Sequence, residues 1–163
     1  MNSIVQIDEK DWEEIAASVY IAVLPFSADE LEQKYGLKAF EYEDDGLGRV
    51  KTCIIQIENT KYWLSSYLDG PDIARFVVVE VQSFEPDTRV ALTQLLDALD
   101  IHEKSLVHCQ DDLGPAKWIL YRVDDNGNET EMYRFHQQES AVWVGKKYEK
   151  KGHKQLYLVT KAT

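Results

Sequence analysis

Residues 118–135, which run WILYRV, DDNGNE and TEMYRF in three blocks of six, decide the fold. The first and last blocks are rich in aromatic and β-branched residues, which favour β-strands. The middle block contains Asn126 and Gly127, the residue types that best tolerate the positive φ of a tight turn. The stretch therefore predicts a β-hairpin with strands at 118–123 and 130–135.

The residues after the hairpin enlarge it into a unit. Residues 139–151 predict a helix in which Ala141, Val144 and Tyr148 share one apolar face. Residues 154–161 predict a third strand. We therefore expect the chain to end in a β-β-α-β unit.

Upstream of this unit, short strand patterns alternate with turn-forming clusters. Residues 39–43, 50–58 and 62–68 predict an antiparallel meander, because apolar residues alternate with polar ones and short turns separate the runs. Residues 74–81 are almost continuously apolar, which predicts a central strand buried on both faces. Residues 106–109 predict a further short strand.

Three helices are expected before the hairpin. Acidic residues near Asp11 suit a helix start and predict a helix over 11–23 that ends before Pro25. Ser27 and Glu30 form a capping-box pattern, which predicts a helix over 28–35 that stops at Gly36. The third is expected over 87–99, with an apolar stripe of Val90, Ala91, Leu95, Leu96 and Leu99.

The predicted fold class is α+β, with a mainly antiparallel sheet, flanking helices and the terminal β-β-α-β unit. Residues 111–115 end in Gly114 and Pro115 and predict an exposed linker. This linker divides the chain into an acidic α+β part, 1–113, and the β-β-α-β unit, 114–163. The two parts either remain separate or fuse into one domain that shares a sheet.

The terminal unit also resembles known proteins. Residues 118–129, Phe135 and the segment GHKQLY at 152–157 resemble short bacterial proteins of unknown function that are sometimes labelled SPOR-like. The resemblance covers about the last 45 of the 163 residues. It implies a bacterial origin and a β-β-α-β unit, and it implies no activity.

Composition and the start of the chain predict a cytoplasmic globular protein. Of the residues, 44% are hydrophobic and 11% aromatic, enough to build a core. No apolar run has the length of a membrane helix, and the first residues lack the basic and apolar regions of a signal peptide. Cys53 and Cys109 are expected to be reduced thiols, with Cys53 on a buried strand face beside Ile55 and Ile57.

No motif for catalysis, metal or cofactor binding is present in the sequence. The 124–129 stretch lacks the Gly and Glu positions of a calcium loop, and the four histidines and two cysteines lack zinc-site spacing. His108 cannot activate Cys109, because consecutive strand residues point to opposite faces. We therefore expect no catalytic residue, no metal and no cofactor.

The charge is distributed unevenly, which points to a partner. Residues 1–113 carry 23 acidic and 9 basic residues, a net charge of −14, whereas residues 114–163 carry 6 and 9, a net charge of +3. Acidic residues steer a basic partner, and aromatic residues among them supply buried anchors. The sequence therefore predicts a non-enzymatic protein that neutralises or sequesters a basic protein, in the class of bacterial immunity or antitoxin-type proteins. The expected contact residues are Tyr42, Glu43, Asp44, Asp45, Glu58, Tyr62, Asp69 and Asp72.

An alternative function uses the helix at 139–151. Trp143, Lys146, Lys147 and Lys150 combine an aromatic ring with positive charges, which suits nucleic-acid binding or a general adaptor role. The larger acidic part would repel nucleic acid, so this function is the less favoured of the two.

Overall fold

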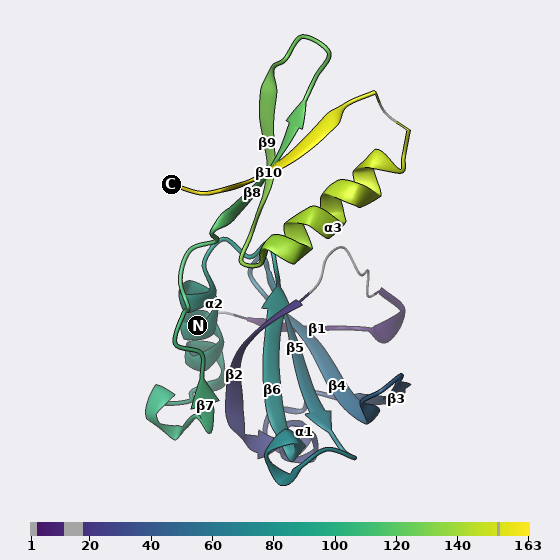
Figure 1. Ribbon diagram of the computed structural model, residues 1–163. Helices are drawn as coiled ribbons and strands as arrows, with labels where there is room; N and C mark the ends of the chain where they lie inside the picture. Colours follow the sequence, from purple (N-terminus) through teal and green to yellow (C-terminus); the bar gives the residue numbers. More distant parts are fainter. Residues whose placement is uncertain (1–2, 12–17, 153) are drawn as a thin grey trace.

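The computed structural model describes residues 3–11, 18–152 and 154–163, which form two antiparallel sheets (Figure 1). The larger sheet has seven strands in the order β1-β4-β5-β6-β2-β7, and β3 also pairs with β4. Its strands are β1 (Ile4–Ile7), β2 (Ser18–Ser27), β3 (Phe40–Asp44), β4 (Gly48–Ile57), β5 (Thr60–Tyr67), β6 (Phe76–Gln82) and β7 (His108–Cys109). The smaller sheet has the order β10-β8-β9 and consists of β8 (Trp118–Val123), β9 (Glu129–Phe135) and β10 (Leu156–Lys161).

Helices flank both sheets. The α-helices are α1 (Ala28–Tyr35), α2 (Thr88–Leu99) and α3 (Gln138–Glu149), and the short 3-10 helices are η1 (Glu9–Asp11), η2 (Asp72–Arg75) and η3 (Glu103–Ser105). The predicted α+β class, with its mainly antiparallel sheet and terminal β-β-α-β unit, is confirmed. None of the helices in the described ranges is long and apolar enough to cross a membrane.

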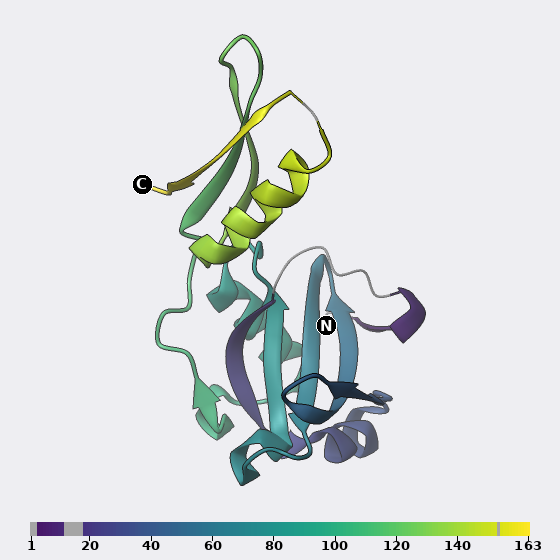
Figure 2. The same cartoon turned by 45° about the vertical axis from the view of Figure 1, so that its right-hand side comes forward.

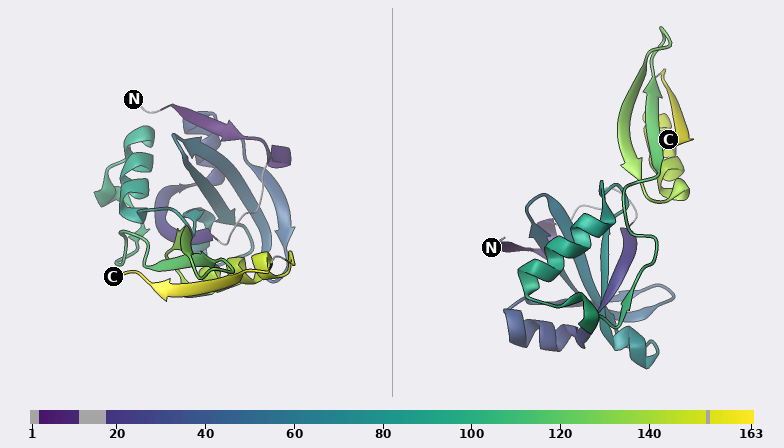
Figure 3. Two further views of the ribbon diagram at one scale, coloured as in Figure 1. Left: turned by 90° about the horizontal axis from the view of Figure 1, so that it is seen from above. Right: turned by 90° about the vertical axis from the view of Figure 1, so that its left-hand side faces the viewer.

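The main core lies on one face of the larger sheet, which we call the inner face. Alternate residues of β4, β5 and β6, such as Cys53, Leu64 and Val79, are fully buried there. Leu31 of α1 and Leu95 of α2 pack into the same cluster, so both helices cover this face (Figure 3, right). Burial raises the pKa of the Cys53 thiol to about 12, in keeping with its expected packing role.

The caps of α1 and α2 explain where these helices begin. The Ser27 hydroxyl accepts a hydrogen bond from the Glu30 N–H, and the Glu30 carboxylate accepts one from the Ser27 N–H, so the predicted capping box is confirmed. Gly36 ends α1 in the left-handed conformation, with φ 69°. The Asp87 carboxylate caps α2. Val90 was expected in the apolar stripe but is 62% exposed, and Leu92 packs into the core in its place.

The predicted helix over 11–23 is wrong from residue 18 onward, because residues 18–27 form β2; residues 12–17 lie outside the described ranges. Ile21 and Leu24 are fully buried, and β2 pairs with β6 on one side and β7 on the other. A continuous apolar run fits a buried strand as well as a helix, and here pairing with two neighbours decides between them.

The central position predicted for β6 is confirmed, but its burial on both faces is not. Val77, Val79 and Val81 are fully buried on the inner face. Val78 and Glu80, which point the other way, are only half-buried. Helices therefore cover β6 on one face.

The terminal unit has a small core of its own. Leu120, Phe135 and Tyr157 of the smaller sheet pack against Ala141 and Val144 of α3, as the helix pattern predicted. The hairpin turn is held by Asp124, whose carboxylate accepts hydrogen bonds from the Asn126 and Asn128 N–H groups at 2.9 Å. The turn is thus an ordinary Asx-type turn.

A short junction joins the two units. The His136 N–H donates to the Ser83 carbonyl at 2.9 Å, and the Ala116 N–H donates to the Pro86 carbonyl at 3.0 Å. Phe84 and Tyr133 are in ring contact, with centroids 6.1 Å apart. The smaller sheet stands beyond the end of the larger one instead of extending it (Figure 3, right), so the units do not share a sheet.

Candidate functional site

The face of the larger sheet opposite α1 and α2, which we call the outer face, gathers aromatic and acidic side chains. Strand register places Ile54, Trp63, Glu80 and Tyr20 in one row across β4, β5, β6 and β2. Residues directly opposite one another on paired strands point to the same face. Their sequence neighbours, such as Tyr62 and Val79, belong to the inner core. The row therefore crosses the outer face.

Strand β3 pairs with β4 at the edge of the larger sheet (Figure 2). An apolar pocket on the outer face lies beside β3. The pocket has a volume of about 240 Å³. It is lined by Glu9, Phe40, Tyr42, Thr52, Ile54 and Trp63. The Phe40 and Tyr42 rings are in contact, with centroids 6.0 Å apart, and Glu9 contributes a carboxylate to the lining.

Glu80 is the charged group at the centre of the outer face. Its carboxylate accepts a hydrogen bond from the Ser18 hydroxyl at 3.1 Å. None of the ion pairs in the described part of the chain involves Glu80. Burial raises the pKa of the Glu80 carboxyl, and the Ser18 hydrogen bond partly opposes this rise. This carboxylate therefore lies in poorly hydrating surroundings, with no counter-ion among the residues that the structure describes.

The Tyr67 hydroxyl is also affected by the charge of Glu80. Burial is the main cause that raises the pKa of its hydroxyl to about 12, and the negative charges of Glu80 and Asp44 add to the rise. The outer face therefore combines aromatic rings with the carboxylates of Glu80 and Asp44, a combination that attracts cations.

Of the eight residues predicted to contact a partner, two belong to this face and a third lies in the turn next to it. Tyr42 lines the pocket and is 41% exposed. Asp44 follows it by two residues on β3, so it points to the same side, and Asp45 lies exposed in the adjoining turn.

Three other predicted contacts lie near basic residues of the chain itself. The Asp69 carboxylate accepts hydrogen bonds from the Arg49 N–H and from Arg49 Nη2, both at 2.8 Å, and these bonds lower the pKa of Asp69. Glu43 is opposite Arg49 in the β3–β4 register. Asp72 lies 3.9 Å from Arg75. These carboxylates are already partly compensated by cations.

The remaining two predicted contacts are not on the outer face. Tyr62 was expected as an exposed anchor, and this is wrong: its side chain is 0% exposed, and its hydroxyl donates to the Ala91 carbonyl at 2.8 Å. Tyr62 alternates with Trp63, and the sheet turns Tyr62 toward α2. Glu58 lies in the turn after β4, at the end of that strand farthest from Asp44.

Sequence reasoning missed Glu9, Trp63, Tyr67 and Glu80. Alternation along β5 separates Trp63 and Tyr67 from Tyr62, but it does not say which set faces the helices. A signal was present in Glu80, an acidic residue inside an otherwise apolar strand. Buried carboxylates are rare without a partner, so this position could have been singled out.

The residues of the alternative site, Trp143, Lys146, Lys147 and Lys150, lie between the middle of α3 and its C-terminal end. Trp143 is 41% exposed, and Lys147 Nζ lies 3.7 Å from the centroid of its ring. Trp143 and Lys146 line a shallow hollow next to Glu139, while Lys150 caps the helix end. An internal lysine therefore already contacts the exposed ring.

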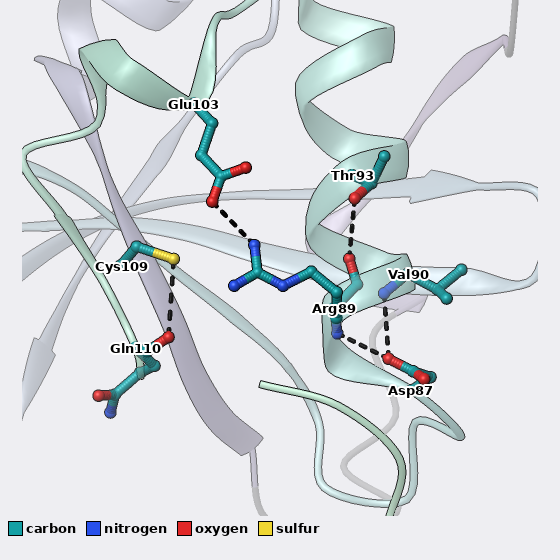
Figure 4. Close-up of polar contacts among 7 residues, drawn as sticks. All are labelled: Asp87, Arg89, Val90, Thr93, Glu103, Cys109 and Gln110. Atoms are coloured by element: carbon teal, nitrogen blue, oxygen red, sulfur yellow. Dashed lines mark hydrogen bonds and ion pairs between the residues drawn. The ribbon is translucent and has the colours of Figure 1, made fainter. Parts of the chain in front are cut away.

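A second group of polar side chains lies near β7, where Cys109 and Gln110 are close to Arg89 and Glu103 (Figure 4). The Cys109 thiol donates to the Gln110 carbonyl at 3.7 Å, and Arg89 Nη1 is paired with Glu103 at 2.8 Å. The His108 ring is hydrogen-bonded to the Tyr20 hydroxyl at 2.6 Å. No group of three or more potential metal ligands occurs within residues 3–11, 18–152 and 154–163.

Comparison of the chain with models of protein families, with curated proteins and with solved structures finds no match.

Proposed function

We propose that this chain is a non-enzymatic binding protein that sequesters a basic protein partner, in the manner of a bacterial immunity protein or antitoxin, and that the outer face is its binding surface. The observation that carries the proposal is the Glu80 carboxylate, half-buried between Trp63 and Tyr20 and without a cation partner among the described residues. Burying a carboxylate without a counter-ion costs free energy. A cation brought by the partner would offset that cost.

Charge and aromatic content support the same proposal. The net charge of −14 over residues 1–113 would steer a basic protein toward this part of the chain. Trp63, Tyr67 and Tyr42 supply large side chains of the kind that dominate binding energy at protein interfaces. A cytoplasmic location is part of the proposal, because both cysteines are free thiols.

Site-specific photo-crosslinking tests the binding surface. A benzophenone amino acid replaces Tyr42 on the outer face, and as a matched control it replaces Tyr133, which is 36% exposed in the terminal unit. We expect crosslinks to a basic protein from position 42 and none to that protein from position 133. A partner captured only from position 133, or an acidic partner, would contradict the proposal.

Nucleic-acid binding by α3 is the second candidate, favoured by the exposed Trp143 beside Lys146 and Lys147. Fluorescence anisotropy with single-stranded DNA and RNA at low salt tests it. Binding that falls steeply with salt and is lost in Lys146→Ala/Lys147→Ala would support this function. Absence of binding at low salt would remove it.

A further inference from the structure

The pocket at the edge of the outer face has aromatic walls and an apolar floor, which favour a ligand with an apolar or planar surface. Phe40 and Tyr42 from β3 and Trp63 from β5 provide aromatic surfaces. The floor is formed by Thr52 and Ile54, which are 2% and 1% exposed. The Thr52 hydroxyl is already hydrogen-bonded to the Ser65 hydroxyl at 2.9 Å, so the floor presents few unsatisfied polar groups. A ligand must therefore bring an apolar or planar surface into the pocket.

The rim adds a requirement for positive charge. Glu9 lines the pocket and takes part in no ion pair found in the described ranges, whereas its neighbour Lys10 lies 3.6 Å from Asp8. Glu80 is the cross-strand neighbour of Trp63, on the side away from Ile54. A cation stacked on Trp63 would thus lie in a pocket lined by the Glu9 carboxylate, with the Glu80 carboxylate on the neighbouring strand, and an anion would be repelled.

Among cations carried by proteins, the guanidinium of arginine fits these surfaces better than the ammonium of lysine. It is planar, stacks on aromatic rings and forms two parallel hydrogen bonds to a carboxylate. It is also more weakly hydrated, so its transfer into an aromatic pocket costs less.

We propose that this pocket receives an arginine side chain of the basic partner, with the guanidinium stacked on Trp63 and paired with Glu9. The inference rests on the proposed function and identifies the group that the outer face recognises. The aliphatic part of the arginine packs against Ile54 and Phe40, and the charged end remains at the rim.

Indole N–H signals in NMR spectra of the ¹⁵N-labelled full chain test this pocket directly. The titrant is N-acetyl-arginine amide, with the lysine and citrulline analogues as matched probes; citrulline keeps the shape of arginine without its charge. The Trp63 signal is assigned with Trp63→Phe. We expect a saturable shift of the Trp63 signal with arginine, about fivefold weaker binding of citrulline, and weaker binding of lysine.

Two variants then test whether the Glu9 carboxylate contributes to arginine binding without a change in the fold. Glu9→Gln should weaken arginine binding about threefold or more while the spectrum stays that of the folded chain. Lys10→Gln, at the next position, should leave binding unchanged or slightly stronger. The exposed Trp143 serves as an internal control, and its signal should not move in step with that of Trp63.

Three results would overturn the assignment: equal binding of arginine and citrulline, no effect of Glu9→Gln, or no saturable shift of Trp63. These outcomes differ from a failure of the proposed function. If the pocket fails but a basic partner still crosslinks from position 42, the outer face remains the binding surface and only the arginine assignment is wrong.

Discussion

Glu80 and Glu85 are two half-buried glutamates whose carboxyl pKa values are raised, mainly by burial. Glu80 lies on the outer face beside Trp63. Glu85 lies at the junction, where its backbone carbonyl is hydrogen-bonded to the His136 ring. Burial of the charge should lower the stability of the fold at both positions, whereas only the charge of Glu80 should contribute to partner binding.

We predict that Glu80→Gln raises the free energy of unfolding at pH 7. Because the folded-state pKa lies above the ordinary value of 4.5, ionisation penalises the folded state; the penalty is complete above the folded pKa and absent well below 4.5. The gain from the variant should therefore disappear in acid. Urea unfolding at pH 7 and well below pH 4.5 measures this difference.

The matched control is Glu85→Gln, which should show the same dependence of stability on pH without any change in partner binding. Destabilisation of the fold at pH 7 by Glu80→Gln would contradict this prediction, because it would mean that the ionised Glu80 carboxylate stabilises the folded state.

Tyr62 provides a prediction that distinguishes a core residue from an interface anchor. Tyr62→Phe removes the hydrogen bond to the buried Ala91 carbonyl and should cost about 1–2 kcal/mol of stability. The affinity of Tyr62→Phe for the partner should be unchanged. By contrast, Tyr42→Phe changes an exposed residue and should leave the free energy of unfolding within about 0.5 kcal/mol of wild type. Urea unfolding and a binding titration together check both statements, and a stable Tyr62→Phe with impaired binding would restore Tyr62 as an anchor.

At the scale of elements, local signals determine where α1 begins. Ser27→Ala removes the hydroxyl that accepts from the Glu30 N–H and should cost about 1 kcal/mol. Glu30→Gln retains an oxygen that can accept from the Ser27 N–H, so it should cost less. Chemical unfolding of both variants tests this ranking, and equal losses would mean that charge, not the reciprocal cap, stabilises the helix start.

The difference between α1 and β2 shows which elements could be predicted. Ser27, Glu30 and Gly36 act on residues close in sequence, so the pattern alone identifies α1. The fate of residues 18–24 depends on pairing with β6 and β7, which lie about 55 to 90 residues away along the chain. Pairing between such distant residues gives no signal in the local sequence. The acidic residues near Asp11 favoured a helix instead.

The candidate site was predictable to the same limited extent. Tyr42 and Asp44 were identified because they lie in an acidic, aromatic hairpin. Trp63 was missed and Tyr62 chosen in its place, because alternation defines two faces of a strand without telling which one the helices cover. The choice follows from where α2 packs.

The whole molecule consists of two units with opposite charge. The acidic larger sheet leaves its outer face free of α1 and α2, and the terminal unit stands beyond the end of that sheet (Figure 3, right). The binding surface that we propose therefore lies entirely on the larger sheet.

This assignment is tested most directly by the association rate of the purified chain with the crosslinked partner, measured by stopped flow across a range of ionic strength. Asp44→Asn/Glu80→Gln removes two charges from the outer face. Asp125→Asn/Glu129→Gln removes two charges from the terminal hairpin and serves as the matched control.

We expect the wild-type rate constant to fall about tenfold or more between low and physiological salt, as electrostatically steered association does. The outer-face variant should associate several-fold more slowly at low salt and lose part of this salt dependence, and the control should behave like wild type. A rate that is indifferent to salt, or equal effects of the two variants, would contradict the claim that the outer face binds a basic partner.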